Sequence, residues 1–270
     1  MTNHKNSFLT KQEQFMLAHK AHHHQVSLCR FFIFFSFLFL WEWSARRGWI
    51  DAFFFSSPSR VVRCFREQLL ENRLLLHIGV TLYETLFSFL FVLFFSLISA
   101  TLLWSYGKLS EITEPYLVIL NSLPKSALAP LFIVWLGTGT TTIIVAGMSV
   151  ALFGSIISIY TGFQQVDAEK LILIQTLGGR KRDAFFKVVL PGSVPTLLST
   201  AKVNIGLALV GVIIGEFLAA RRGLGYLIIY GSQVFQLDMV ITAILILCLI
   251  AFAFYKSIQV MEHRLKSRFL

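Results

Sequence analysis

Few polar side chains interrupt the long apolar segments of this sequence, and those that do have the chemistry to bind a solute or another helix. Lys125 follows Pro124 in one apolar stretch, and Glu216 stands in another among Val, Ile and Gly residues. A charge inside an apolar helix is costly, so such a residue lines a polar path or pairs with a group on a neighbouring helix. Lys125 and Lys202 are candidate partners for Glu216. The sequence leaves both roles of Glu216 open.

No pattern in the chain predicts catalysis, so we do not expect an enzyme. The Gly137–Thr142 stretch lacks the Lys that a nucleotide-binding loop supplies to a phosphate, and neither a Gly-x-Ser-x-Gly nor a His-Glu-x-x-His pattern occurs. The chain itself is therefore expected to bind no ATP and no other cofactor. The His-rich start, with His4, His19 and His22–His24, could hold a divalent metal. No spaced ligand pair accompanies it, so we expect an irregular tail without a metal site.

The longest polar interruption in the second half of the chain is Gln164–Gly192, whose pattern predicts two short helices around a turn. Asp167 is a suitable N-cap for a helix over Ala168–Leu177, because its carboxylate can accept a hydrogen bond from a free backbone N–H of the first turn. Glu169 falls in that turn, where the helix dipole favours an anion. The start of the first helix is therefore well defined.

Gly178 and Gly179 are expected to end this helix, since glycine readily adopts the left-handed conformation of a C-terminal cap. A second helix is expected over Arg180–Leu190, with Pro191 ending it and with basic and apolar residues on opposite faces. Such a hairpin could lie at the lipid headgroups. It could also insert, as a short rigid helix, into a groove on a soluble partner.

The composition of the chain places these residues in a membrane protein. Of 270 residues, 56% are hydrophobic, 27 are Phe and only 14% are charged, whereas a soluble domain carries about 25% charged residues. Runs such as Leu86–Leu103 and Ile241–Phe254 contain no Asp, Glu, Lys or Arg. We therefore expect an all-α integral membrane protein in contact with lipid. The net charge of +10 is assigned to basic membrane-flanking segments, not to nucleic-acid binding.

A helix needs roughly 20 residues to cross a bilayer, and windows of that length predict about six transmembrane helices. The windows are Phe31–Trp49, Leu82–Trp104, Pro115–Leu136, Thr141–Phe163, Val194–Ala220 and Met239–Lys256. Pro124 and Pro130 each lack a backbone donor, so the third span is expected to be kinked or broken. Glu42 and Glu84 lie near the ends of their windows, from where they are expected to reach the interface in structural roles.

Counts of Lys and Arg orient the chain with both termini in the cytoplasm. In that topology the inner segments hold fourteen of these residues and the outer segments eight, and the richer side is cytoplasmic. The hairpin over residues 164–192 then faces the cytosol. The chain divides into a cytoplasmic N-terminal tail (1–30), a transmembrane domain (31–260) and a cytoplasmic C-terminal tail (261–270). A surface helix is expected over Ser59–Leu76.

The hairpin carries a recognisable spacing of residues. Nine residues separate Gly178 from Val188, and Leu190-Pro191 follow after one more residue. This spacing resembles the cytoplasmic signature of ABC importer permeases, which reads Glu-Ala-Ala, three residues, Gly, nine residues, Ile, one residue, Leu-Pro. Ile172-Leu173-Ile174 stand where that family has its Glu-Ala-Ala triplet. The loss of the Glu removes one acidic contact from the docking surface.

Two further stretches resemble the same family, in the branch that imports nitrate, sulfonates, taurine and thiamine-pyrimidine precursors. They are Leu123–Gly137 and Gly215–Ile228. The resemblance implies a permease subunit of the bacterial cytoplasmic membrane, with a coupling segment that docks on an ATPase subunit, so that ATP is used by the partner. The docking residues that it implies are Asp167, Glu169, Leu177, Gly178, Gly179, Arg180, Val188, Leu190 and Pro191.

The resemblance also implies an assembly of two permease subunits, two ATPase copies and an extracytoplasmic solute-binding protein. A permease homodimer is expected, and a heterodimer stays open. Pro124, Lys125 and Glu216 are the candidates for the translocation path. The cargo is expected to be a small polar or anionic organic solute that the sequence does not name. The alternative is an ion-coupled secondary transporter, for which Glu216 is the one candidate site.

Overall fold

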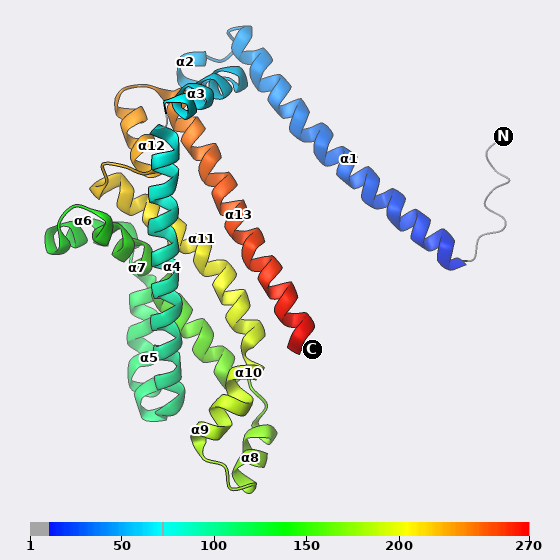
Figure 1. Cartoon of the computed structure of the whole chain (residues 1–270), viewed down its shortest axis with the longest axis vertical. Helices are drawn as coiled ribbons and strands as arrows, with labels where there is room; N and C mark the ends of the chain where they lie inside the picture. The colour runs from blue at the N-terminus through cyan, green and yellow to red at the C-terminus, as the bar shows by residue number, and fades with distance from the viewer. Residues whose placement is uncertain (1–10, 72, 270) are drawn as a thin grey trace. The chain divides into compact units, whose positions relative to one another are not determined.

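A computed structural model describes residues 11–71 and 73–269 of the protein. Every regular element in these residues is a helix, as Figure 1 shows. The all-α fold is therefore confirmed. The chain separates into two compact units between Arg63 and Cys64.

The first unit consists of a long apolar helix and a short segment over residues 47–63, which we call the hook. α1 (Lys11–Arg46) contains a stretch apolar enough to span a membrane, Gln25–Arg46, and α2 (Ala52–Phe55) and the start of α3 (Pro58–Leu70) follow it. α1 begins well before its apolar part, so the region expected to be an irregular tail is helical from Lys11 onward. Lys, Gln, Glu, Ala and Leu in this region favour a helix. His4 lies outside the described residues.

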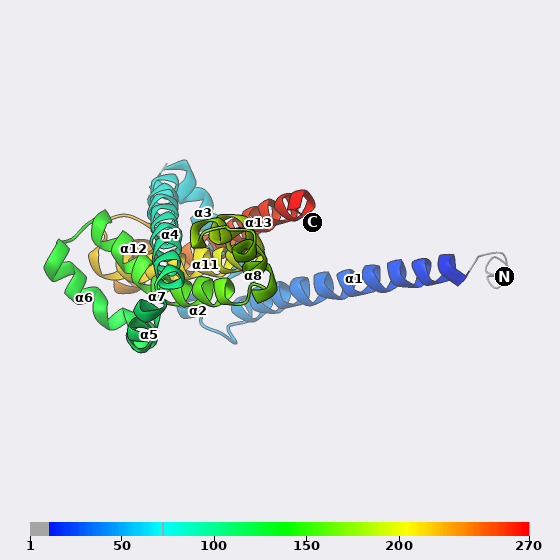
Figure 2. The same ribbon diagram turned by 90° about the horizontal axis from the view of Figure 1, so that it is seen from below.

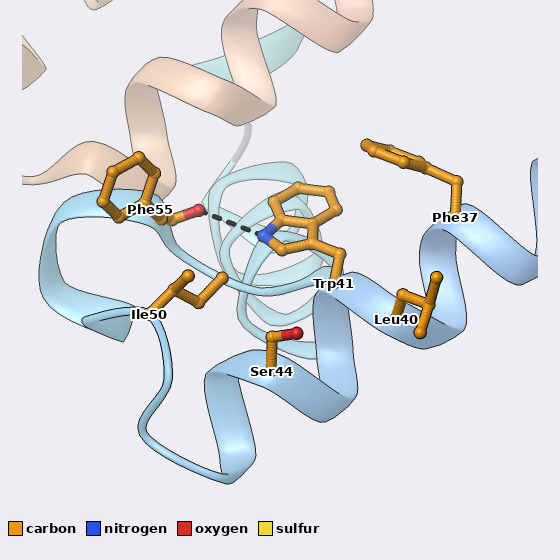
Figure 3. A pocket seen from close by; sticks show the side chains of 6 residues that line it. All are labelled: Phe37, Leu40, Trp41, Ser44, Ile50 and Phe55. Carbon is orange, nitrogen blue, oxygen red and sulfur yellow. Dashed lines mark hydrogen bonds between the residues drawn. The ribbon is translucent and has the colours of Figure 1, made fainter.

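Side-chain hydrogen bonds hold the hook to the end of α1. The Glu42 carboxylate accepts hydrogen bonds from the backbone N–H of Ser59 at 3.0 Å and from its hydroxyl at 2.9 Å, which is the structural role expected for Glu42. The Trp41 indole N–H points to the carbonyl oxygen of Phe55 and donates to it at 3.3 Å (Figure 3). Beside this bond lies a mostly apolar cavity of about 420 Å³. It is lined by Phe37, Leu40, Trp41, Ser44, Ile50 and Phe55.

The core of the second unit is formed by three long helices, α4 (Arg73–Ser105), α7 (Thr140–Gln164) and α11 (Val194–Ala219). They pack side by side in Figures 1 and 2. Small residues permit this packing, since a Cβ on Gly211 would lie only 2.8 Å from the Cα of Gly147. Close backbone approach at small residues is a usual way for membrane helices to associate, because lipid gives little hydrophobic drive.

Two further helices, α12 (Leu224–Gln233) and α13 (Leu237–Phe269), pack against this core. α13 continues well past Lys256, the end of the sixth predicted window. The extension brings Glu262 into an ion pair with Lys202 of α11. Lys202 therefore pairs with a neighbouring helix and is not available to Glu216.

The third predicted span is two helices. α5 (Gly107–Ser122) and α6 (Lys125–Leu136) meet at an angle of 95°. The break lies at Pro124, which lacks the N–H that would continue α5 and forces the preceding Leu123 into an extended conformation (ψ 141°). The expected break is confirmed there, whereas Pro130 lies inside α6 without ending it.

The expectation of about six spans agrees with the helices observed. Five helices of the described chain are long and apolar enough to cross a membrane, and the bent pair makes a sixth span if it counts as one. The predicted boundaries were less accurate. α3 ends at Leu70, not Leu76, and α4 begins at Arg73, not Leu82.

Candidate coupling site and buried carboxylates

The segment between α7 and α11 folds into short helices, and the first of them begins as its capping residue predicts. α8 (Ala168–Thr176) starts after Asp167, whose Oδ1 atom accepts a hydrogen bond from the Glu169 N–H at 3.1 Å. Glu169 lies in the first turn. Its charge is favourable there because the N–H groups at the start of a helix carry partial positive charge.

A glycine turn ends α8. Gly178 has φ +77°, in the left-handed region, and its N–H donates to the Gln175 carbonyl at 3.0 Å. The Gly179 N–H donates to the Ile174 carbonyl at 2.9 Å, so two of the last carbonyls of the helix are satisfied. A Cβ at position 178 would meet no atom within 4 Å. Backbone conformation, not space, is therefore what favours glycine at this position.

The second helix differs from the prediction at its end. α9 (Lys181–Ala184) continues through a π-helical turn, η2 (Phe185–Val189), into α10 (Leu190–Gly192), and α11 follows directly. Pro191 therefore does not stop the helical path. It occupies the start of α10, where a missing N–H costs little. The hairpin is thus continuous with a core membrane helix.

Two contacts fix this hairpin to the ends of α4 and α7. The Lys181 ammonium group donates to the Ser105 carbonyl at 2.6 Å and lies 5.3 Å from the ring centre of Trp104. The buried Phe185 ring packs against Trp104 and Phe163, with centroids 5.3 Å and 5.5 Å apart. Nothing in the sequence predicts the contact of Lys181 with Ser105 and Trp104. Phe185 was recognisable only as part of an apolar helix face.

The far side of the hairpin exposes apolar side chains. Ile172 and Leu173 are each 57% exposed, and Leu177 is 75% exposed. We call these three residues the apolar knob. Glu169 and Arg180 are also exposed beside it, whereas Leu190 packs into the aromatic cluster around Phe185. The predicted docking residues are therefore divided between an outward face and an inward face, and Val188 is half-buried with the inward group.

One known protein family matches the part of the chain that contains this hairpin. The family model described as "Binding-protein-dependent transport system inner membrane component" matches residues 92–267. The chain belongs to this family. It is an ABC importer permease, a multi-pass protein of the bacterial cytoplasmic membrane. The family consists of transporter subunits, which are not enzymes and which work with ATPase subunits and binding proteins.

Relatives of this permease extend the match over most of the chain. A probable ABC transporter permease protein of Haemophilus influenzae is 33% identical over 229 residues, covering 84% of this chain and 92% of that protein. A putative aliphatic sulfonates transport permease protein of Bacillus subtilis is 26% identical over 227 residues, covering 84% of this chain and 82% of that protein. The resemblance found in the sequence is confirmed.

Solved structures share the fold of this permease. A chain of the MetNI methionine ABC transporter in an inward-facing conformation aligns with a TM-score of 0.58 at 19% identity, covering 69% of this permease and 95% of that chain. A chain of an amino acid ABC transporter crystallised with histidines aligns with a TM-score of 0.60 at 16% identity. The alignment covers 74% of this permease and 97% of that chain. At these identities the likeness concerns the fold alone.

In this permease Glu216 holds the start of α12. Its Oε1 atom accepts a hydrogen bond from the Thr81 hydroxyl at 2.6 Å, and its Oε2 atom accepts one from the Gly225 N–H at 2.5 Å. The Thr81 oxygen in turn accepts from the Leu224 N–H at 2.8 Å. A Cβ on Gly225 would lie 2.7 Å from Oε2 of Glu216. The small residue is therefore required for the carboxylate to reach the backbone.

Glu84 corrects an expectation from the sequence. It is 1% exposed and is hydrogen-bonded to the equally buried Glu216, so it lies inside the helix bundle. The reason is the true start of α4 at Arg73, which puts Glu84 deep in the helix. The Oε2 atom of Glu84 receives no hydrogen bond from the described residues.

Lys125 is not brought to Glu216 either. Its ammonium group donates to the carbonyl oxygens of Leu120, at 3.0 Å, and Asn121. It thereby caps the last turn of α5 beside the break at Pro124, where a cation is favoured by the helix dipole. Neither of the candidate partners, Lys125 or Lys202, therefore pairs with Glu216. The place of Pro124, Lys125 and Glu216 in a translocation path stays a prediction.

Proposed function

We propose that this permease couples ATP hydrolysis by a separate subunit to the import of a small polar or anionic organic solute. The observation that carries the proposal is the hairpin over residues 164–192, which is anchored on one side and exposes the apolar knob on the other. Exposed apolar side chains on a rigid cytosolic helix are suited to a groove on a partner protein. Asp167, Glu169, Gly178 and Arg180 frame this docking surface.

The same hairpin is built to pass force to the membrane helices. Its inner end runs through η2 and α10 into α11 without an intervening loop. Lys181 and Phe185 attach it to the ends of α4 and α7. A displacement of the knob by the ATPase would therefore move three core helices together. Such coupling links two distant sites through an element with two arrangements, inward-open and outward-open.

The assembly follows from the same proposal. Two copies of the permease would enclose a path between them, each bound to one ATPase subunit, with a solute-binding protein delivering cargo from outside. No cofactor is bound by the permease, and ATP is used by its partner. The printed names of relatives support the type of cargo, since they concern aliphatic sulfonates, formylaminopyrimidine and, in an Escherichia coli protein 26% identical over 155 residues, taurine.

Co-purification tests the docking step. Candidate ATPase subunits are co-expressed with the tagged full chain, and the amount captured is measured for the unmodified chain, for Leu173→Glu and for Gln175→Glu. Gln175 is the matched control, because it is exposed on the same helix and receives the same charge. We expect Leu173→Glu to reduce capture of the ATPase about tenfold, since a buried unpaired charge and a lost apolar contact each weaken the interface. Equal capture by the two variants, or no ATPase with the unmodified chain, would overturn the proposal.

A further inference from the structure

A polar cavity of about 500 Å³ lies in the second unit, where α4, the turn before α7 and the end of α11 meet. Its size falls within the range of small-molecule sites in proteins. The residues of its lining that can bind a polar ligand are Glu84, Thr138, Gly139, Thr140, Arg221 and Arg222. None of them belongs to the coupling hairpin, so the cavity is a separate feature of the permease.

Two arginine side chains bring positive charge to this cavity. Arg221 and Arg222 both line it, and neither forms an ion pair with a carboxylate among the described residues. A guanidinium group presents several N–H donors in a fixed plane, which suits the oxygens of a sulfonate, carboxylate or phosphate group. Two adjacent arginines without an acidic partner therefore favour an anionic group in the cavity.

The start of α7 adds donors to the same space. This 25-residue helix begins at Thr140 after Gly139, and no side chain caps it. Its first backbone N–H groups are therefore free of a side-chain acceptor, and the positive end of the helix dipole lies at the cavity lining. The hydroxyl group of Thr138 can donate there as well, whereas that of Thr140 is hydrogen-bonded to Glu84.

Glu84 adds a hydrogen-bond acceptor to the donors that line this cavity. Its carboxyl group is 1% exposed, lines the cavity and is hydrogen-bonded to Thr140 and Glu216. Its Oε2 atom accepts no hydrogen bond from the described residues. A buried acceptor left in this way is costly. A ligand that carries a hydrogen-bond donor, such as an ammonium group, a short distance from its oxyanion would satisfy both Glu84 and the arginines.

We propose that this cavity is a solute-binding site of the permease itself, which takes a small organic molecule with an oxyanion group and a nearby amine or hydroxyl donor. The proposal rests on the proposed function and deepens it, because it assigns to the membrane subunit a site that recognises cargo. The headgroup of phosphatidylethanolamine carries the same pair of groups. The proposed ligand is a soluble molecule. Occupation of the cavity by phosphatidylethanolamine is one outcome of the test below.

Taurine is a suitable probe, since it joins a sulfonate to an ammonium group through two carbons. The purified full chain, in an uncharged maltoside detergent, is titrated with taurine and with ethanesulfonate, which lacks the ammonium group. We expect saturable binding of taurine and weaker binding of ethanesulfonate. Arg221→Gln combined with Arg222→Gln should weaken taurine binding about tenfold or more. Glu84→Gln should remove most of the preference for taurine over ethanesulfonate.

Arg66→Gln is the control for the arginine variant, because Arg66 is exposed, carries the same charge and does not line the cavity. It should bind taurine as the unmodified chain does. Equal affinity of the double arginine variant and the unmodified chain, or no saturable taurine binding, would overturn the site. Retention of phosphatidylethanolamine that taurine cannot displace would overturn it as well. Co-purification of the double variant with the ATPase tests the proposed function separately, since Arg221 and Arg222 do not lie on the coupling hairpin.

Discussion

Lys181 and Ser105 are joined by a hydrogen bond of 2.6 Å, from the ammonium group of α9 to the backbone carbonyl at the end of α4. The two residues stand 76 positions apart in the chain. The same Lys181 ammonium group lies over the Trp104 ring. The contact attaches the hairpin to the core, as the proposed coupling between docking and movement of the core helices requires.

Lys181→Gln is expected to leave docking of the ATPase intact and to impair solute transport. The substitution removes the charge-assisted hydrogen bond and the contact with Trp104, each of which is worth about 1 kcal/mol. Solute uptake by the assembled complex in proteoliposomes should fall about five- to thirtyfold, while the ATPase still co-purifies. Lys187→Gln is the control, as Lys187 is an exposed cation of the same hairpin. The prediction fails if both variants transport at the same rate.

Gly178→Val should abolish transport without preventing membrane insertion. The φ of +77° at position 178 is strained for any side chain, at a cost of about 1–2 kcal/mol, and a β-branched residue fits it worst. The turn would open and displace the knob from its docking geometry. Uptake and solute-stimulated ATP hydrolysis are the measurements, with the amount of protein in the membrane as a check on insertion.

Gly206→Ala provides the comparison for this variant. Gly206 lies in α11 with nothing within 4 Å of the position that a Cβ would take, and its φ is not in the left-handed region. It should transport normally. Solute-stimulated ATP hydrolysis at the unmodified rate in the Gly178→Val complex would show that the turn is not needed.

Gly225→Ala should destabilise the membrane domain. Its Cβ would lie 2.7 Å from Oε2 of Glu216, so the hydrogen bond between the carboxylate and the start of α12 would have to lengthen or break. Overpacking of this kind costs about 1–3 kcal/mol. Thermal unfolding of the purified permease should show a lower Tm than that of Ser232→Ala, which changes an exposed residue of the same helix. An unchanged Tm would mean that Glu216 does not hold α12.

The local features of this fold could be predicted because neighbouring residues determine them. Asp167 as a cap, the glycine turn at Gly178 and the break at Pro124 each follow from the conformational preference of one residue. The length of α4 could not be predicted in the same way. Arg73 and His77 lowered the hydropathy of its first turns, although both residues belong to the helix.

The contacts of the charged residues could not be predicted from sequence, since each joins distant parts of the chain. Glu216 meets Thr81, 135 positions away, and Lys202 meets Glu262. The sequence suggested cations as partners of Glu216, whereas its partners are a hydroxyl group, a backbone N–H and the neighbouring carboxyl group of Glu84. Hydrogen-bond donors without charge satisfy a buried carboxyl group, and composition does not reveal them.

The docking of the apolar knob on an ATPase can be measured directly in the assembled complex. A photo-cross-linking amino acid is placed at Leu177, which is 75% exposed at the glycine turn, and another at Val234, an exposed residue after α12. Illumination should join position 177, and not position 234, to the ATPase subunit. Cross-links to the ATPase from position 234 alone, or from neither position in a complex that hydrolyses ATP, would contradict the account.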